Sequence, residues 1–185
     1  MTLSFAAIFT AAVFLASGLG KLTARGAVSS FIEQLGIPKS WLPAINTIIP
    51  VAEIALGLLL VSGIAIRQVA MVSAVVAASF LAAHLLSLVR GNTASCRCFG
   101  TLDTALRPAV SAIRAGVFLA ATIALAVLAA GSAAEVTPAT VAGGLMAAVS
   151  YILAFHLINE TATLVSRDRQ IHQGLIAAAE RLDQA

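Results

Sequence analysis

Five apolar stretches, each long enough to cross a bilayer, dominate the pattern of hydrophobic and polar positions along this sequence. They cover residues 3–22, 42–66, 69–89, 109–130 and 138–165. A transmembrane helix needs about 20 consecutive, mostly apolar residues. The pattern therefore predicts an all-α polytopic membrane bundle within residues 1–165, made of a four-helix core and a fifth transmembrane helix.

Two segments outside these stretches are more polar but still carry apolar residues at helical spacing. In the first loop they are Val28, Phe31, Ile32 and Leu35. They predict a short helix at the membrane interface, ended by Gly36 and Pro38. In residues 166–185 one helical face holds Ile171, Leu175, Ile176, Ala179 and Leu182. We expect this polar tail to form an amphipathic surface helix.

The amino-acid composition agrees with a membrane protein. Of the 185 residues, 60% are hydrophobic and only 10% are charged, and the mean hydropathy is +1.00. A soluble domain is typically about 45–50% apolar and about 25% charged. We therefore expect the lipid bilayer to be the partner that covers most of the apolar side chains of this chain. The formal net charge of +3 is too small to indicate nucleic-acid binding.

The positively charged residues are distributed unevenly between the two sides that five spans create. Ten of the 11 Lys and Arg residues fall on the side of the first loop, the 90–108 loop and the tail, and only Arg67 falls on the other. Cytoplasmic loops of membrane proteins carry an excess of Lys and Arg. The charge pattern therefore predicts a multi-pass protein of the inner or plasma membrane, with its N-terminus outside and the 90–108 loop inside.

Several ionisable side chains interrupt the apolar stretches. They are Lys21, Glu53, His84, Arg114, His156 and Glu160. An ionisable residue in hydrocarbon costs at least about 2.5–3.5 kcal/mol on insertion scales, so each is a functional candidate. We expect a polar cavity beneath the 90–108 loop, with Glu53 facing the interior near Lys21, His84 or Arg114. Glu53 could form a structural ion pair with Lys21 or Arg114, or could handle protons or bind a ligand, and His84 could instead donate to a backbone carbonyl.

Both cysteines of the chain lie in that loop, in the sequence Cys96-Arg97-Cys98-Phe99-Gly100. Two thiols separated by one residue can close a small disulfide ring, and strained or exposed disulfides are oxidising and labile. Arg97 between the cysteines would stabilise a thiolate, and Phe99 could anchor the loop on the bundle. The motif therefore indicates reversible thiol–disulfide exchange, with Cys96 and Cys98 as the catalytic pair and Arg97 in support.

Two other interpretations of the cysteine pair stay open. The thiolates could hold Cu(I) or another soft metal ion in a carrier, although two are too few for a closed zinc site, which takes four ligands. The cysteines could also be chemically inert, in a non-enzymatic subunit of a membrane complex. No motif in the sequence indicates a resident metal or an organic cofactor.

The chain resembles the MauE/DoxX-like redox-associated membrane proteins, and most closely the methylamine-utilisation MauE branch. The resemblance covers roughly residues 3–130. In the first two spans it rests on Gly18-Leu19-Gly20-Lys21-Leu22, on Pro50-Val51-Ala52-Glu53 and on Gly57-Leu58. Its most specific part is Arg90-Gly91 followed by Cys96-Arg97-Cys98-Phe99-Gly100, and Arg114 in the next span also matches.

The resemblance implies a four-helix membrane bundle that supports disulfide formation in other proteins, often together with a thioredoxin-like partner. On this view Cys96 and Cys98 exchange the disulfide, and Glu53 and Arg114 are its buried support. By analogy with DsbB and vitamin K epoxide reductase, a quinone would accept the electrons. The resemblance also implies a partner in the periplasm, which is the side opposite to the one that the charge pattern predicts for the loop.

The charge pattern makes a prediction about sidedness that labelling can test. A single cysteine introduced as Gln173→Cys in a Cys96→Ser/Cys98→Ser background should react with a membrane-impermeant maleimide only after cell lysis, because the basic tail is expected in the cytoplasm. Labelling of intact cells or spheroplasts would contradict this orientation. It would place the loop outside, where a periplasmic partner could reach it.

Overall fold

A computed structural model of the chain describes residues 2–91, 99, 108–130 and 137–183. In these residues every regular element is a helix, which confirms the predicted all-α fold. The helices are α1 (Thr2–Thr23), α2 (Arg25–Gln34), the 3-10 helix η1 (Lys39–Trp41), α3 (Leu42–Ser62), α4 (Ile66–Val89), α5 (Pro108–Leu128) and α6 (Pro138–Asp183). Five segments are long and apolar enough to span a membrane, as predicted: α1, α4, α5, η1 together with α3, and the first part of α6.

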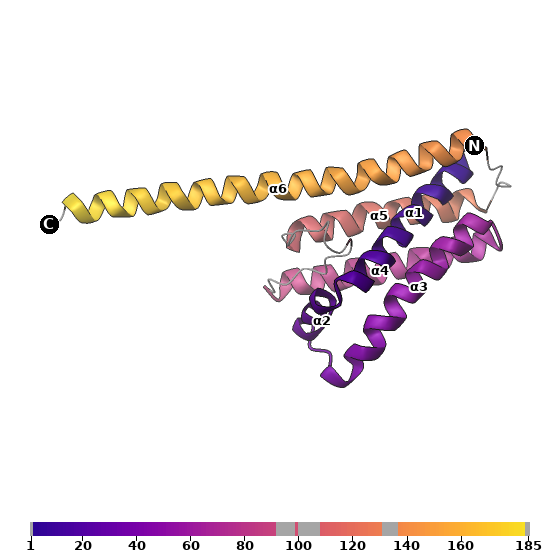
Figure 1. Ribbon diagram of the computed structural model, residues 1–185, viewed down its shortest axis with the longest axis horizontal. Helices are drawn as coiled ribbons and strands as arrows, with labels where there is room; N and C mark the ends of the chain where they lie inside the picture. Colours follow the sequence, from indigo (N-terminus) through magenta and orange to yellow (C-terminus); the bar gives the residue numbers. More distant parts are fainter. Residues whose placement is uncertain (1, 92–98, 100–107, 131–136, 184–185) are drawn as a thin grey trace.

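Helix α1 is the centre of the bundle. It packs against α3, α5 and α6, and it crosses the middle of the molecule in Figure 1. In its most apolar window 56% of the residues are buried, compared with 17–33% in the other four spans. Because the other spans leave most of their apolar side chains on the outside, the bilayer must cover them.

Glycines let two helices approach α1 closely. A Cβ atom at Gly18 would lie 2.9 Å from the carbonyl oxygen of Pro50 in α3. A Cβ atom at Gly144 of α6 would lie 2.8 Å from the side chain of Ile8. Small residues at such crossings drive helix association in lipid, where the hydrophobic effect gives no attraction between helices.

Helix α3 ends earlier than the second apolar stretch, which runs to residue 66. It stops at Ser62 because Gly63 adopts a left-handed conformation with φ of 70°. Glycine at this position commonly ends helices, since it has no Cβ to strain. Helix α4 then begins at Ile66, so Arg67 lies in the first turn of α4 and not in the connecting turn.

The predicted short helix in the first loop is present as α2. Its apolar side buries Val28, Phe31 and Ile32 against Leu42 at the start of α3. The guanidinium of Arg90, at the end of α4, donates a hydrogen bond to the carbonyl oxygen of Leu35, with Nη1 and O 2.7 Å apart. These contacts attach α2 to the start of α3 and to the end of α4.

Helix α6 contains both the fifth span and most of the polar tail as one continuous helix of 46 residues. At 1.5 Å per residue it is about 70 Å long, whereas the hydrocarbon core of a bilayer is about 30 Å thick. Figure 1 shows its C-terminal half extending well past the ends of the other helices. The polar tail therefore continues the helix of the fifth span. The chain has no break between them at which a separate surface helix could begin.

The close crossing at Gly18 can be tested with two alanine substitutions. Gly18→Ala should destabilise the bundle by about 1–3 kcal/mol, because the added methyl group has no space. Gly116→Ala is the control: nothing lies within 4 Å of a Cβ atom there, so it should be neutral or stabilising by up to about 1 kcal/mol. Denaturant titration of the detergent-solubilised proteins, followed by circular dichroism, measures both. Equal stability of the two variants would contradict the tight crossing.

Candidate functional site

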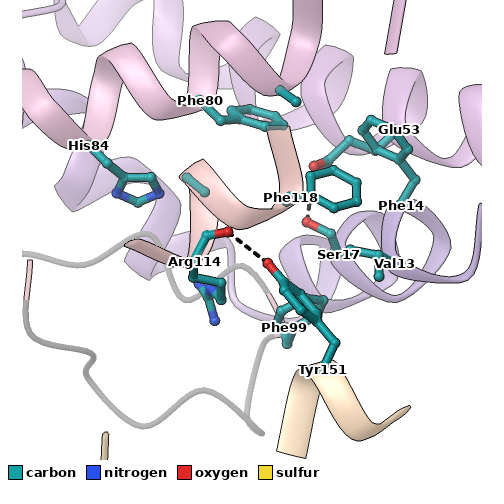
Figure 2. A pocket seen from close by; sticks show the side chains of 12 residues that line it. Val13, Phe14, Ser17, Glu53, Phe80, His84, Phe99, Arg114, Phe118 and Tyr151 are labelled. Atoms are coloured by element: carbon teal, nitrogen blue, oxygen red, sulfur yellow. Dashed lines mark hydrogen bonds between the residues drawn. The ribbon is translucent and has the colours of Figure 1, made fainter. Parts of the chain in front are cut away.

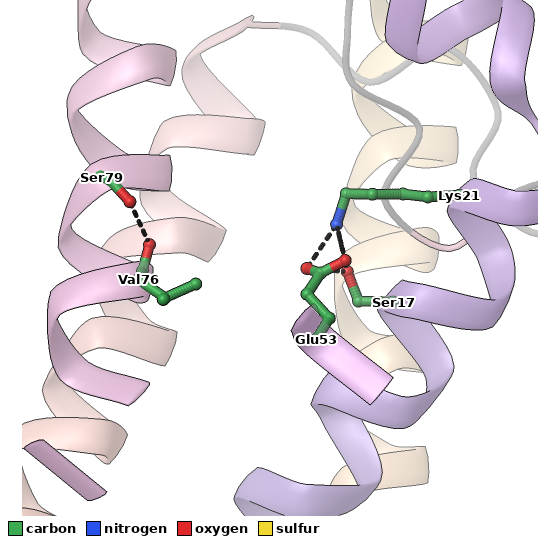
Figure 3. Close-up of polar contacts among 5 residues, drawn as sticks. All are labelled: Ser17, Lys21, Glu53, Val76 and Ser79. Carbon is green, nitrogen blue, oxygen red and sulfur yellow. Dashed lines mark hydrogen bonds and ion pairs between the residues drawn. The ribbon is translucent and has the colours of Figure 1, made fainter. Parts of the chain in front are cut away.

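A buried ion pair joins α1 to α3. The ammonium nitrogen of Lys21 lies 2.5 Å and 2.7 Å from the two carboxylate oxygens of Glu53, and each side chain is only 1% exposed. Ser17 completes the group: its hydroxyl donates to Glu53 at 3.0 Å and accepts from Lys21 at 2.6 Å (Figure 3). The expectation that Glu53 faces the interior and meets a cationic partner is confirmed, and that partner is Lys21.

The local sequence explains how these three side chains meet. Ser17 and Lys21 are four residues apart and therefore share one face of α1. Gly18 lies between them in the chain and admits the backbone of α3, with the Cβ atom of Glu53 only 3.3 Å from a Cβ atom built at Gly18. The Lys21 ammonium also lies 4.8 Å from the ring centroid of Phe80 in α4. The ion pair thus forms where three helices converge.

A small cavity lies next to this ion pair and is lined from five long helices and the 90–108 loop (Figure 2). Its lining residues are Val13, Phe14, Ser17, Glu53, Ala77, Phe80, His84, Phe99, Arg114, Ala115, Phe118 and Tyr151. The volume open to the centres of water-sized molecules is ≈ 40 Å³. Since one water needs about 10–15 Å³ by this measure and several polar partners, the cavity suits a few water molecules.

Phe99 attaches the cysteine loop to the cavity. It is the one residue between 92 and 107 that the structure describes, and it is 7% exposed. The guanidinium carbon of Arg114, a buried residue of α5, lies 5.0 Å from the ring centroid of Phe99. This is the geometry of a cation–π contact, which is stronger when the cation is desolvated. Phe99 is thus buried on the bundle, as expected, and Cys98 is the residue directly before it in the sequence.

His84 lies on the side of the cavity nearest α2. The imidazole is buried, and its centroid is 5.1 Å from that of the Phe31 ring. One turn further along α4, toward the loop, Ser87 is also buried, as is Ser111 one turn before Arg114 in α5. In the part of the chain that the structure describes, neither serine hydroxyl has a hydrogen-bond partner. Polar groups therefore continue from the cavity toward the loop end of α4 and α5.

Tyr151 of α6 is a cavity residue that the sequence analysis missed. Its hydroxyl donates a hydrogen bond of 2.8 Å to the backbone carbonyl of Arg114 (Figure 2). Its ring packs edge-on against Phe9 and Phe155, with centroids 5.7 Å and 5.1 Å apart. A signal was present in the sequence, because this is the single tyrosine of the chain and lies inside an apolar span. A phenol in hydrocarbon must find an acceptor.

The structure brings together four of the predicted site residues: Lys21, Glu53, His84 and Arg114. The other three, Cys96, Arg97 and Cys98, lie outside the described residues. Among the described residues, His156 and Glu160 do not line the cavity. No three His, Cys, Asp or Glu side chains within that described set lie together as metal ligands would.

The arrangement suits the chemistry of an anion beside the loop. Lys21 and Glu53 compensate each other's charge, and the guanidinium of Arg114 lies against the ring of Phe99, which follows Cys98 in the sequence. Nearby Arg or Lys side chains stabilise a cysteine thiolate. As the described residues bound it, the cavity of ≈ 40 Å³ is far smaller than the roughly 300–1,000 Å³ of small-molecule pockets, and it is too small for a quinone ring.

Comparison with known proteins identifies one family. The sequence model of the family described as methylamine utilisation protein MauE matches residues 1–131, which include α1 to α5. No curated protein and no solved structure matches the chain significantly. The match confirms the MauE branch of the resemblance, while the link to DoxX stays a prediction.

The buried ion pair predicts a strong coupling between its two residues. Lys21→Met or Glu53→Leu alone should destabilise the bundle by about 3–5 kcal/mol, because each leaves a buried charged group without its partner. The double variant Lys21→Met/Glu53→Leu should lose much less than the sum of the single losses. Unfolding of the purified protein in detergent measures the cycle, and additive losses would contradict the pairing.

Proposed function

Because the chain belongs to the MauE family, we propose that it serves methylamine utilisation as a membrane component of thiol–disulfide exchange. On this proposal Cys96 and Cys98 form a reversible disulfide that is passed to a thioredoxin-like partner. The family match and the five spans support a multi-pass membrane protein. The exchange chemistry is inferred from the cysteine motif and from the residues beneath it.

One observation carries the proposal: the stacking of Phe99 on Arg114. The contact holds the residue after Cys98 on a buried guanidinium, with 5.0 Å between the guanidinium carbon and the ring centroid. A cation held in a low-dielectric setting acts on a neighbouring anion more strongly than it would in water. A thiolate at Cys98 would therefore be favoured, and a disulfide that releases this thiolate would be a good oxidant.

The proposed exchange balances without any further reactant. A thiolate of the partner attacks the sulfur of Cys96, the Cys96–Cys98 bond breaks, and Cys98 leaves as a thiolate. The second partner thiol, once deprotonated, attacks the partner sulfur of the mixed disulfide and releases Cys96. The partner dithiol loses two electrons and two protons and becomes a disulfide, while Cys96 and Cys98 gain them and become two thiols.

The buried groups of the cavity support this step in different ways. The Lys21–Glu53 pair and Ser17 fix α1 on α3, which forms one wall. His84 of α4 lines the opposite wall, beside Phe31 of α2. The quinone of the analogy takes no part in the proposed step, which ends with the reduced cysteine pair.

The orientation remains part of the proposal. The charge pattern puts the loop and the tail of α6 on the cytoplasmic side of the inner or plasma membrane, where a cytoplasmic thioredoxin-like protein could reach the cysteines. A periplasmic partner, which the family resemblance implied, requires the opposite orientation. The maleimide experiment on Gln173→Cys distinguishes the two.

The proposal predicts two thiols that appear only on reduction. Mass-tagging of thiols in isolated membranes should show a difference of two tags between reduced and non-reduced samples, because both cysteines of the chain form one disulfide. Cys96→Ser and Cys98→Ser should each abolish that difference and the oxidation of a dithiol partner.

The same assay separates the redox function from its alternatives. Two free thiols under oxidising conditions would contradict thiol–disulfide exchange. If these free thiols were protected from tagging by Cu(I), the chain would instead be a soft-metal carrier. Free thiols that Cu(I) does not protect would leave the non-enzymatic subunit as the interpretation.

A further inference from the structure

We propose that a groove between α4 and α5 binds one anionic phospholipid, whose headgroup phosphate lies on Arg67 and one of whose acyl chains lies between the two helices. The groove is at the end of the bundle where α4 begins, opposite to the 90–108 loop that follows α4. All the residues that line it belong to the described part of the chain. The inference goes beyond thiol–disulfide exchange and does not depend on it.

Small side chains form the floor of the groove, and larger ones form its walls. Ala74 of α4 and Ala126 of α5 are half-buried where the two helices pack side by side (Figure 1). The walls are more exposed apolar side chains: Met71, Val75, Ile123 and Val127. The volume open to the centres of water-sized molecules is ≈ 530 Å³. The groove is therefore an apolar hollow on the surface that α4 and α5 turn to the lipid.

The length and direction of the groove match one leaflet of a bilayer. From Arg67 to Val75 it follows α4 for about 12 Å, at a rise of 1.5 Å per residue. It begins at the start of the span and runs toward the middle of the membrane. One leaflet contributes about 15 Å, which is half of the hydrocarbon thickness. An acyl chain that enters from the headgroup region would therefore lie in the groove over most of its leaflet.

Arg67 places a positive charge at the headgroup end of the groove. Its side chain is exposed in the first turn of α4, and among the described residues its guanidinium has no ion pair or hydrogen bond. In the pattern of spans, all the other Lys and Arg residues fall on the opposite side of the membrane. A guanidinium offers parallel N–H donors to a phosphate, so it can hold a headgroup in one position.

The start of α4 adds to this preference for an anion. The residue before the helix is Ala65, which provides no side-chain cap. The first N–H groups of a helix have no acceptor within the helix, and together with the helix dipole they favour a phosphate. The groove, the guanidinium and the helix start thus fit a ligand with a phosphate at one end and an apolar chain at the other.

The headgroup charge distinguishes the proposed ligand from the other lipids of a bilayer. Because α4 and α5 are spans, any lipid can cover their apolar side chains. In a zwitterionic phospholipid the phosphate already lies beside the ammonium group of its own headgroup. Phosphatidylglycerol has no ammonium group, so its phosphate keeps a net charge for Arg67. We expect this to favour phosphatidylglycerol over phosphatidylcholine about fivefold.

Quenching of a local tryptophan by brominated lipid measures this preference at the groove itself. The reporter is Met71→Trp in a Trp41→Phe background, which removes the single native tryptophan. The full-length protein is reconstituted into phosphatidylcholine vesicles that contain brominated phosphatidylglycerol or brominated phosphatidylcholine. Brominated phosphatidylglycerol should bind at this reporter about fivefold more tightly. A control reporter, Leu153→Trp on the exposed side of α6, should show no preference.

Variants of Arg67 test the contact with the headgroup. Arg67→Gln should abolish the preference, whereas Arg67→Lys should keep most of it because the charge remains. Lys39→Gln is the matched control, since it removes the same charge from an exposed residue of η1, before the start of α3. It should leave the preference at the Met71→Trp reporter unchanged.

Variants of the floor test whether an acyl chain lies in the groove. Ala126→Leu fills the floor and should weaken the binding of phosphatidylglycerol at the reporter. Ala124→Leu makes the same change at an exposed position of α5 that does not line the groove, and it should have no effect. Ala74→Leu fills the same floor from α4 and takes the place of Ala126→Leu if that variant fails to fold.

Three results would overturn the inference. The first is equal quenching by the two lipids at the Met71→Trp reporter. The second is a preference that persists in Arg67→Gln, because the charge of Arg67 would then not select the lipid. The third is a preference unaffected by the floor variants, because the headgroup would then bind without a chain in the groove. None of them bears on the proposed function, which fails only if mass-tagging shows no reversible disulfide.

Discussion

The ion pair between Lys21 and Glu53 is the interaction on which the rest of the structure depends. Two charges buried among apolar helices are tolerated only when each satisfies the other, so α1 and α3 can meet in few registers. Gly18 allows the close approach that brings Glu53 to Lys21, and Ser17 takes up further hydrogen-bonding capacity of the pair. Helix α1 then offers its other faces to α5 and α6.

The small polar cavity follows from this crossing. Glu53 and Ser17 line it from one side, and α4 and α5 bring His84 and Arg114 to the other. Lys21 pairs with Glu53, and among the described residues the guanidinium of Arg114 contacts Phe99 of the 90–108 loop.

Helix α6 adds to the bundle that the family match covers. It follows the matched residues, packs on α1 and supplies Tyr151 to the cavity wall. Its C-terminal half extends past the bundle on the side where α4 ends and α5 begins (Figure 1). The same helix therefore contributes to the candidate site with its first half and extends beyond the ends of the other helices with its second half.

The sequence by itself determined the membrane class, the five spans and the short helix α2, because hydrophobic periodicity and length are local properties of the chain. It also indicated that Glu53 needs a buried cation, since the cost of a lone carboxylate in lipid does not depend on the fold. Only the tertiary structure decided that the cation is Lys21 and that Arg114 instead stacks on Phe99. The tertiary structure also showed that Tyr151 belongs to the site. Such choices depend on the register and rotation of helices that are far apart in the sequence, and helix packing sets these through contacts that no local pattern records.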